Sequence, residues 1–345
     1  MHESKRGIMA FVLMLSAVVG CTGRVCAAEP STGYVASAQP TNPTTDQPAG
    51  ALHLTSFEEP PASDQANSTV TEKRASPFSI SATYSLYSDY ILRGINLSEY
   101  RGEGREKPNH QMTTSITTDV GLLFGEDAGS WGSFGFVTFF EWFAAQRKID
   151  PVGGGQNLQE VDYSMSWSYP LTPISSTFTL GYTFLTFPNR TQANTHEWYV
   201  KLAHNDTWMW KWLWPDNDGP VLSPWVFLSH DVDSAAGGSW IETGVKHDFA
   251  VVENVTVSPA MTLAIDHRYL DRLLATGSRG STRLAYLQYA LSVGYNLSSA
   301  LNWSDKYGTV VLSGFLNFND ALGNTDDDGT ISDEFYGGIS LGWSF

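Results

Sequence analysis

The sequence alternates apolar and polar residues in long runs, and the last of these runs reaches the final residue of the chain. Between 331 and 345 the odd positions carry mostly large apolar side chains, and the even positions mostly small or polar ones. The apolar set is Ile331, Phe335, Ile339, Leu341, Trp343 and Phe345. Because the side chains of a β-strand alternate between the two faces of a sheet, this pattern predicts a strand with one apolar and one polar face.

Four further segments, 161–169, 178–184, 255–265 and 285–295, alternate in the same way. Such runs exceed the roughly five or six residues of a typical strand in a soluble domain. Their polar faces carry Ser, Thr, Gly and Asn rather than the Lys and Glu of a surface in water, and aromatic residues gather near the run ends. These features favour a sheet surrounded by lipid over a soluble β-sandwich, whose strands also alternate.

A sheet in lipid must close, because lipid offers no hydrogen-bonding partner to an open edge. We therefore expect an all-β fold over residues 78–345: a transmembrane, antiparallel, up-and-down β-barrel of about 12 strands, the even number typical of bacterial barrels. The strands are expected to start near Phe78, Gln111, Ser133, Gln159, Ser175, Thr195, Val221, Ser239, Val255, Ser281, Tyr307 and Ile331. Short turns at 170–173 and 251–254 are expected on the periplasmic side, and longer loops at 99–108, 148–157, 270–280 and 321–330 on the extracellular side.

The N-terminus has the pattern of an export signal. Lys5 and Arg6 precede an apolar stretch over 8–20, which is shorter than the ~20 residues that a spanning helix needs. We expect a signal peptide over 1–28, whose removal leaves a mature chain without cysteine, as suits an oxidising compartment. The alternative is a lipoprotein box that ends in Cys21, which would leave Cys21 lipidated as the first mature residue.

Residues 29–77 are rich in Pro, Ser, Thr, Ala and Gln and show no sustained periodicity. A segment of this composition buries too little apolar area to offset the entropy lost on ordering it. We expect a disordered periplasmic linker here, with a wall-binding or partner-binding arm as the alternative.

The chain carries a formal net charge of −16, from 36 acidic against 20 basic residues. This charge argues against binding to nucleic acid, which requires a basic surface. An exported barrel of this kind belongs in the bacterial outer membrane, so its expected partners are outer-membrane lipid and lipopolysaccharide. We expect no cofactor, and the sequence assigns no oligomeric state.

Extending the alternation inward gives a set of charged residues that are expected to face the lumen. The set is Asp89, Arg93, Glu141, Glu197, Lys201, Asp231, Glu242, Lys246, Asp248, Asp266 and Arg268. Asp89 and Arg93 would lie on the first strand and meet charges on neighbouring strands, such as Glu334 or Asp119. Two functions remain open for this set. The charges either pair and fill a narrow interior, or line a pore that favours cations or neutral solutes, because acids outnumber bases.

Four Trp residues occupy alternate positions in the segment 208–214, a connection on the expected periplasmic side, where they would share one face of an extended segment. Trp favours the headgroup region of a bilayer, so this segment is predicted to be an interfacial anchor, with a lipid- or sugar-binding ledge as the alternative. The predicted interface set is Trp208, Trp210, Trp212, Trp214, Trp343 and Phe345.

Metal binding and catalysis are only weakly indicated. Asp326 and Asp328 lie in a segment similar to the start of a calcium loop, but position twelve is Phe335 rather than Glu, which favours an acidic hairpin tip. A lipid acyl hydrolase needs a Ser and a His within hydrogen-bonding distance. In the run 229–231 the alternation puts His230 on the face opposite its neighbours Ser229 and Asp231. We expect no catalytic residue and no enzyme.

The segment Ser88–Ile95, with the sequence SDYILRGI, resembles the S-D-Y-x-x-R-G-I signature of the TorF-type family of porin-like bacterial outer-membrane barrels. The final residues Ile339–Phe345 are similar to the closing strand of outer-membrane barrels generally, in which the last aromatic residue, here Phe345, helps the barrel-assembly machinery to recognise the chain. The resemblance implies a porin-like role in the passive passage of small solutes. The alternatives are an outer-membrane lipid acyl hydrolase and a structural barrel with a plugged lumen.

Overall fold

The computed structural model describes residues 76–96, 108–143, 158–186, 188, 194–215, 219–233, 237–270, 282–323 and 331–345. The predicted signal peptide with Cys21, the predicted linker up to residue 75, and the calcium candidates Asp326 and Asp328 lie outside the described residues. Most residues of the four predicted long loops also lie outside them. No helix in the described ranges has the length and apolar character needed to cross a membrane.

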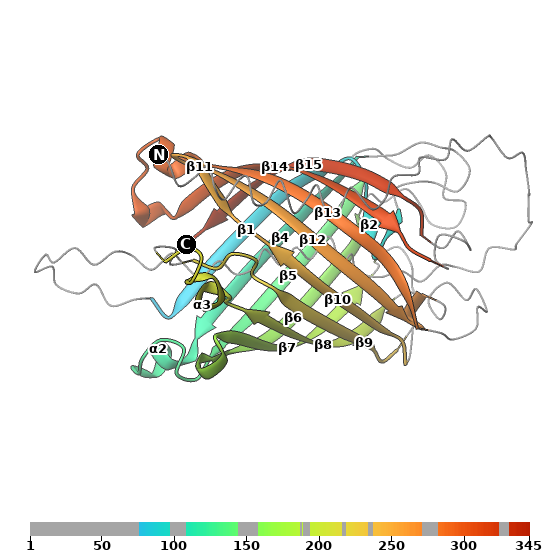
Figure 1. The fold of residues 1–345 in the computed structure, drawn as a ribbon, viewed down its shortest axis with the longest axis horizontal. Helices are drawn as coiled ribbons and strands as arrows, with labels where there is room; N and C mark the ends of the chain where they lie inside the picture. The colour runs from blue at the N-terminus through green and yellow to red at the C-terminus, as the bar shows by residue number, and fades with distance from the viewer. Residues whose placement is uncertain are drawn as a thin grey trace, which may run out of the picture. The chain divides into compact units, whose positions relative to one another are not determined.

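Thirteen strands of the described residues form one antiparallel sheet, in which strands that follow one another in the chain lie side by side (Figure 1). These strands are β1 (Phe78–Tyr87), β4 (Asn109–Asp119), β5 (Ser133–Phe143), β6 (Leu158–Leu171), β7 (Ser176–Thr186), β8 (Thr195–His204), β9 (Trp225–Asp231), β10 (Ser239–Lys246), β11 (Phe249–Val252), β12 (Val255–His267), β13 (Thr282–Asn296), β14 (Thr309–Ala321) and β15 (Glu334–Ser344). A separate hairpin joins β2 (Ile91–Leu92) to β3 (Ile95–Asn96).

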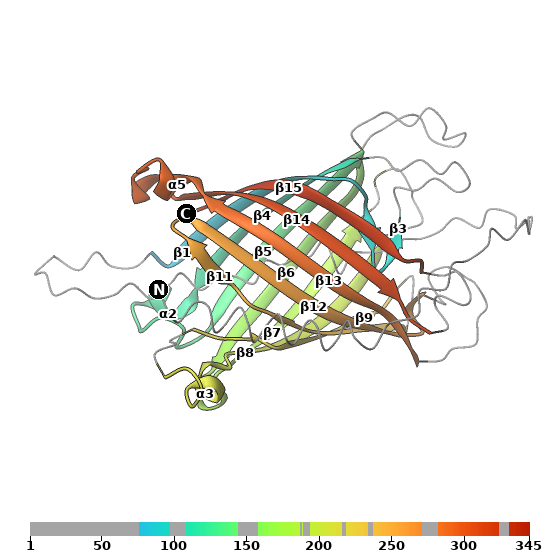
Figure 2. The same ribbon diagram turned by 45° about the horizontal axis from the view of Figure 1, so that its top comes forward.

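The sheet closes on itself. The first strand, β1, pairs with the last, β15, and β10 pairs with β12. The short β11 pairs with the next part of β12, so β10 and β11 together occupy one position in the wall. The described residues therefore form a closed barrel of twelve strand positions, and the predicted antiparallel up-and-down barrel is confirmed (Figure 2).

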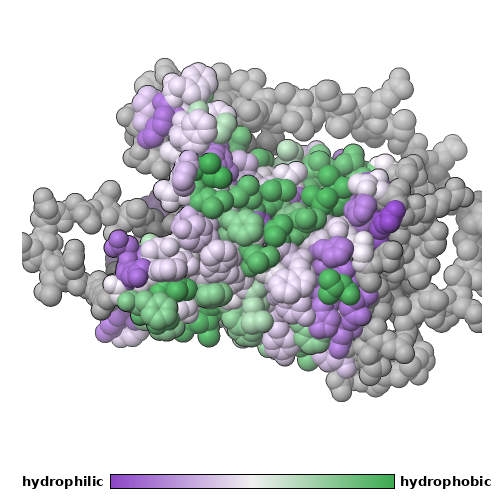
Figure 3. All heavy atoms as spheres, turned by 90° about the horizontal axis from the view of Figure 1, so that it is seen from below, coloured by the Kyte–Doolittle hydropathy of each residue, from purple (hydrophilic) through white to green (hydrophobic). Residues whose placement is uncertain are grey.

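The alternation in the sequence separates the two faces of the wall. On β6, Tyr163 and Met165 are exposed on the outside, whereas Asp162 and Ser164 are buried on the inside. On β15 the odd positions Phe335, Ile339, Leu341 and Trp343 are exposed in the same way. Figure 3 shows apolar side chains gathered over the middle of the wall. The exterior is therefore apolar and the interior mostly polar, as the pattern predicts.

The two ends of the barrel differ. At one end, which we call the turn end, short helical connections join the strands, and the C-terminal Phe345 lies beside Ile80 of β1. These connections are α2 (Val120–Phe124), η1 (Thr172–Ile174), α3 (Thr207–Trp210), α5 (Leu297–Ala300) and η2 (Asp305–Tyr307). Side-chain caps start two of them: the Asp119 carboxylate accepts a hydrogen bond from the Leu122 amide at 3.0 Å at the start of α2, and the Asn296 side chain accepts one from the Ser299 amide at 3.0 Å at the start of α5. At the opposite end, which we call the loop end, the described residues include the β2–β3 hairpin.

A cluster of buried apolar side chains lies in the lumen near the loop end, and we call it the lumen cluster. It comprises Trp240, Ala264, Tyr269, Leu270, Ala285, Tyr286, Ala321 and Ile331, with Ile95 of the hairpin packed against it. Ile331 had been expected to face lipid on the last strand, and this expectation is wrong. The strand starts only at Glu334, and Ile331 precedes it in a segment that packs inward, where it is 1% exposed.

The expectation that the tryptophan segment is extended, with all four rings on one face, is also wrong. Residues 207–210 form the short helix α3, and turns follow it. Trp208 and Trp212 are 63% and 78% exposed, whereas the rings of Trp210 and Trp214 pack with their centroids 5.7 Å apart. Because the segment is helical, Trp208 and Trp212 are exposed, whereas Trp210 and Trp214 pack against each other.

Asp206, the residue before α3, holds this connection together. Its buried carboxylate accepts hydrogen bonds from the backbone amides of Val221 at 2.8 Å, Leu222 at 2.9 Å and Ser223 at 3.3 Å. It also accepts one from the Trp210 indole at 2.7 Å. One side chain thus ties the two ends of the connection between β8 and β9.

The contacts of Asp206 predict how the free energy of unfolding depends on pH. Burial opposes the charged form, but the backbone and indole hydrogen bonds outweigh it and lower the pKa of Asp206 below the usual 3.8. A lowered carboxyl pKa stabilises the fold above the usual pKa, and this contribution disappears as the pH falls through the folded-state pKa. We expect Asp206→Asn to lower the free energy of unfolding by on the order of 1–3 kcal/mol at neutral pH.

The difference between wild type and Asp206→Asn should shrink as the pH falls below about 4, because protonated Asp206 no longer differs in charge from Asn. Urea unfolding of the refolded barrel at a series of pH values measures it. Asp127→Asn, which removes an exposed carboxylate at the same end, should change stability little at any pH. A difference that stays constant across the carboxyl range would contradict the role given to Asp206.

Candidate functional site

The segment Ser88–Ile95 forms the β2–β3 hairpin instead of extending the first strand. β1 ends at Tyr87, and the hairpin turns at Arg93 and Gly94, whose φ angles are 46° and 84°. Two central residues with positive φ are typical of a type I′ hairpin turn. A Cβ on Gly94 would lie 2.8 Å from Tyr286 Cδ1 and 2.9 Å from Ile331 Cγ2, so the turn requires glycine.

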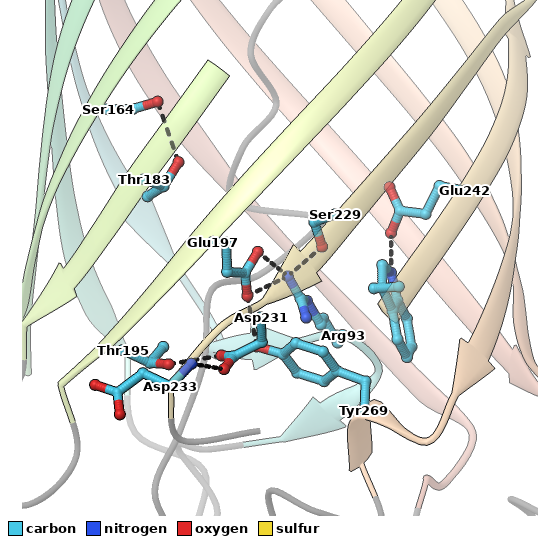
Figure 4. Close-up of polar contacts among 11 residues, drawn as sticks. Arg93, Ser164, Thr183, Thr195, Glu197, Ser229, Asp231, Asp233, Glu242 and Tyr269 are labelled. Atoms are coloured by element: carbon cyan, nitrogen blue, oxygen red, sulfur yellow. Dashed lines mark hydrogen bonds and ion pairs between the residues drawn. The ribbon is translucent and has the colours of Figure 1, made fainter. Parts of the chain in front are cut away.

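Arg93 is buried at the tip of the hairpin and pairs with the opposite wall. Its Nη2 atom donates hydrogen bonds to both carboxylate oxygens of Glu197 on β8, at 2.8 and 2.7 Å, and to Ser229 Oγ on β9, at 3.1 Å (Figure 4). Arg93 had been expected to meet Glu334 or Asp119. That expectation is wrong, because the turn at Tyr87 carries Arg93 off the first strand to β8.

Aromatic rings complete the surroundings of the Arg93 guanidinium. Its Cζ atom lies 3.7 Å from the centroid of the Tyr269 ring and 5.5 Å from that of Trp240. The Tyr269 hydroxyl donates a 2.6 Å hydrogen bond to Glu197 Oε1. The same carboxylate therefore binds the guanidinium and orients the ring that stacks on it.

Three further contacts hold the hairpin in the lumen. The Tyr90 hydroxyl donates to Glu160 on β6, and Asn96 Nδ2 donates to Glu334 Oε2 on β15 at 3.3 Å. Ser88 exchanges hydrogen bonds with Gly337 on β15. Together with Arg93, these residues connect the hairpin to β6, β8, β9 and β15, so the hairpin crosses the lumen at the loop end.

The predicted acidic residues lie mainly on the inner wall near the loop end. Glu141 on β5 is the cross-strand neighbour of Glu160 on β6, a residue outside the predicted set, and both are almost fully buried. Glu197 and Asp231 are neighbours on β8 and β9. Asp231 accepts a 2.6 Å hydrogen bond from Thr195 Oγ1 and a 2.8 Å one from the Asp233 amide (Figure 4).

Two more of the predicted acids are buried in the same region, and Asp89 of the hairpin is 1% exposed. Asp266 at the end of β12 pairs with Arg283 Nε on β13 at 3.0 Å. Glu242 on β10 accepts hydrogen bonds from the Trp240 indole at 2.8 Å and the Tyr286 hydroxyl at 3.1 Å. Hydroxyl, indole and guanidinium donors thus stabilise these carboxylates inside the barrel.

The predicted basic residues are less uniform. Lys201 is half-buried, and its Nζ lies 5.4 Å from the centroid of the Trp225 ring. Lys246 pairs with Asp248 at 3.0 Å at the turn end, where their side chains are 25% and 39% exposed. Arg268 is exposed at the end of β12 with a φ of 61°, so the alternation of the strand no longer directs it inward.

The histidines bear on the enzyme alternative. His230 is exposed on the outer face, whereas Ser229 and Asp231 are buried on the inner face, so these three side chains do not converge. Ser–His pairs do occur elsewhere: His230 Nδ1 lies 2.9 Å from Ser239 Oγ on the neighbouring strand, and His204 Nδ1 lies 2.9 Å from Ser176 Oγ. Among the described residues, no group of three or more His, Cys, Asp or Glu side chains could hold a metal ion.

Several residues of this site were missed at the level of the sequence: Tyr90, Glu160, Ser229, Trp240, Tyr269 and Arg283. A signal for the hairpin was present. Gly94 interrupts the apolar residues at 91–92 and 95, and a glycine inside such a run signals a turn or bulge. The alternation of Leu86, Tyr90 and Leu92 obscured it by continuing the period of the first strand.

The buried pair gives a prediction that a double-mutant cycle can test. Removing one partner of a buried ion pair leaves an uncompensated charge. Arg93→Ala should therefore lower the free energy of unfolding by up to about 3–5 kcal/mol, and Glu197→Gln should lower it by less. The double variant should cost clearly less than the sum of the two. Lys246→Ala, which breaks the half-exposed pair with Asp248, should cost no more than about 1 kcal/mol. Additive single effects would contradict a direct interaction.

No protein-family model matches the chain, and no curated protein matches its sequence. Among solved structures, the chain is similar to an outer-membrane channel from Pseudomonas putida F1, with 7% identity and a TM-score of 0.43, over 81% of this chain and 100% of that one. It is also similar to the NanC porin, with 9% identity and a TM-score of 0.39, over 77% and 98%. A third similar structure is the KdgM porin in complex with disordered oligogalacturonate, with 10% identity and a TM-score of 0.38, over 77% and 99%. These likenesses are low, and the fold assignment rests on the strand pairing of the chain itself.

Proposed function

We propose that the chain is a porin-like barrel of the bacterial outer membrane that passes small solutes and favours cations. The observation that carries the proposal is the excess of acidic groups in the lumen. Within the described part of the chain, the buried charged residues on the loop-end inner wall and the hairpin are Asp89, Glu141, Glu160, Asp162, Glu197, Asp231, Glu242 and Asp266 against Arg93 and Arg283. A surplus of carboxylates lowers the energy of a cation in the lumen and raises that of an anion.

The outside of the wall supports a membrane location. Large apolar side chains are exposed on the strands around the barrel, and a closed sheet with such a surface is stable in a bilayer. In this proposal the turn end faces the periplasm and the loop end faces lipopolysaccharide and the cell exterior. Trp208, Trp212, Trp343 and Phe345 then lie at the periplasmic interface, where the barrel-assembly machinery would recognise Phe345.

The hairpin supports passage of small solutes rather than large ones. It contacts β6, β8, β9 and β15, which lie around the barrel, so it occupies part of the cross-section at the loop end. A solute must pass between the hairpin and the acidic wall. Glu141 and Asp162 are almost fully buried in this conformation, and in the proposal they line the passage once a solute has entered it.

The same hairpin favours a second candidate function, a structural barrel with a plugged lumen. Its buried ion pair and the packing of Ile95 against the lumen cluster are what a permanent plug requires. Purified protein added to planar bilayers distinguishes the two candidates. Discrete conductance steps support the channel, and their absence from correctly folded barrel supports the plug.

Selectivity follows from the charge of the lining. In a gradient of potassium chloride, the reversal potential of the wild-type channel should have the sign of a cation-preferring pore. Glu141→Gln and Asp162→Asn each remove a buried carboxylate from the lumen, and each should lower the potassium-to-chloride permeability ratio by roughly twofold or more.

Asp127→Asn is the matched control, because it removes the same charge from an exposed position at the turn end. Its reversal potential should equal that of wild type. A wild-type channel that prefers anions, or equal shifts in the lumen and control variants, would contradict cation selection by these carboxylates.

A further inference from the structure

The residues around Arg93 have the composition of a binding site for an organic cation. Glu197 supplies a carboxylate, Ser229 a hydroxyl and Tyr269 an aromatic face 3.7 Å from the guanidinium carbon. A guanidinium is planar and weakly hydrated, and it binds carboxylates at its edge and aromatic rings at its face. These three residues therefore match the chemistry of the group that they hold.

A second carboxylate adds to the negative charge of this site. Glu242 is 4% exposed and lies close enough to interact electrostatically with Arg93. Trp240, whose indole donates to Glu242, also presents its ring to Arg93 at 5.5 Å. Trp240 thus connects a second buried carboxyl group to the surroundings of the guanidinium.

The cation and its site belong to different parts of the fold. Glu197, Ser229 and Glu242 are on strands of the closed wall, whereas Arg93 is at the tip of a two-residue turn with positive φ. If the hairpin moved away without a replacement, the wall carboxyl groups would lose the cation that compensates them, which is unfavourable. The hairpin can therefore leave this position readily only if another cation takes the place of Arg93.

We propose that the residues around Arg93 form a binding site for guanidinium-bearing solutes, and that such a solute displaces Arg93 and moves the hairpin away from the acidic wall. Binding at this site requires only the wall residues. The opening of a passage by this exchange rests on the proposed channel function. The solutes that would bind at the loop end of the lumen are therefore small organic cations with a guanidinium group.

Binding is tested with methylguanidinium as the probe, by calorimetric titration of the full-length, refolded barrel in detergent at constant ionic strength. Arg93→Ala vacates the site, so it should bind methylguanidinium at least about tenfold more tightly than wild type, in which Arg93 competes. Adding Glu197→Gln to Arg93→Ala should abolish this gain. Lys246→Ala, which removes a positive charge from the turn end, should bind as weakly as wild type.

Equal binding by wild type and Arg93→Ala, or binding that survives Glu197→Gln, would overturn the proposed site. If Arg93→Ala does not form the heat-modifiable barrel, Arg93→Lys replaces it. Its ammonium group stacks less well on Tyr269 and competes less, so methylguanidinium should bind more tightly than to wild type. An affinity no higher than that of wild type would overturn the proposal.

Conductance separates this inference from the channel proposal. In planar bilayers, methylguanidinium should raise the open fraction of the wild-type channel, whereas the same concentration of potassium should not. Arg93→Ala should be open without the probe. Channels that conduct but do not respond to methylguanidinium would refute the exchange and leave the porin function standing. Specific binding to a barrel that never conducts would refute the porin function and leave the binding site standing.

Discussion

The buried ion pair between Arg93 and Glu197 determines what occupies the loop end of the lumen. It joins the tip of a hairpin that follows β1 to the far wall at β8, and the surrounding contacts are consistent with this position. Tyr269 both stacks on the guanidinium and donates to the same carboxylate. Ile95 reaches the lumen cluster only because the hairpin lies across the barrel. Without the arginine, the acids on this wall would lack their nearest buried positive charge.

The alternation of apolar and polar residues predicts most of the barrel, because lipid and lumen impose different demands on the two faces of every strand. Tyr163 and Met165 are outside and Asp162 is inside for this reason. Glu141, Glu197 and Glu242 likewise lie on the inner face that the alternation gives them. The alternation predicts side-chain direction only within a strand. Arg268 lies just beyond the end of β12 and is exposed, although its position in the alternation predicts that it faces inward.

The hairpin shows what strand periodicity cannot predict. Leu86, Tyr90 and Leu92 continue the apolar period of β1, yet the chain turns inward after Tyr87. The partners that hold it there, Glu160 and Glu197, are 70 and 104 residues away from Tyr90 and Arg93 in the chain. The prediction for the tryptophan segment was wrong for a similar reason: Asp206 accepts hydrogen bonds from backbone amides 15 to 17 residues away, and these contacts hold the helical turn. Such distant contacts leave no periodic trace in the sequence.

The central claim is that the hairpin lies inside the barrel, and cysteine cross-linking measures this directly. Asn96 and Glu334 face each other across 3.3 Å, whereas Phe335, the next residue, is 65% exposed on the outer face. A short bifunctional thiol reagent should link Asn96→Cys to Glu334→Cys in the folded barrel, with single-cysteine variants accounting for Cys21 and Cys26. It should not link Asn96→Cys to Phe335→Cys. A hairpin outside the lumen would give no Asn96–Glu334 link, and that result would contradict the account.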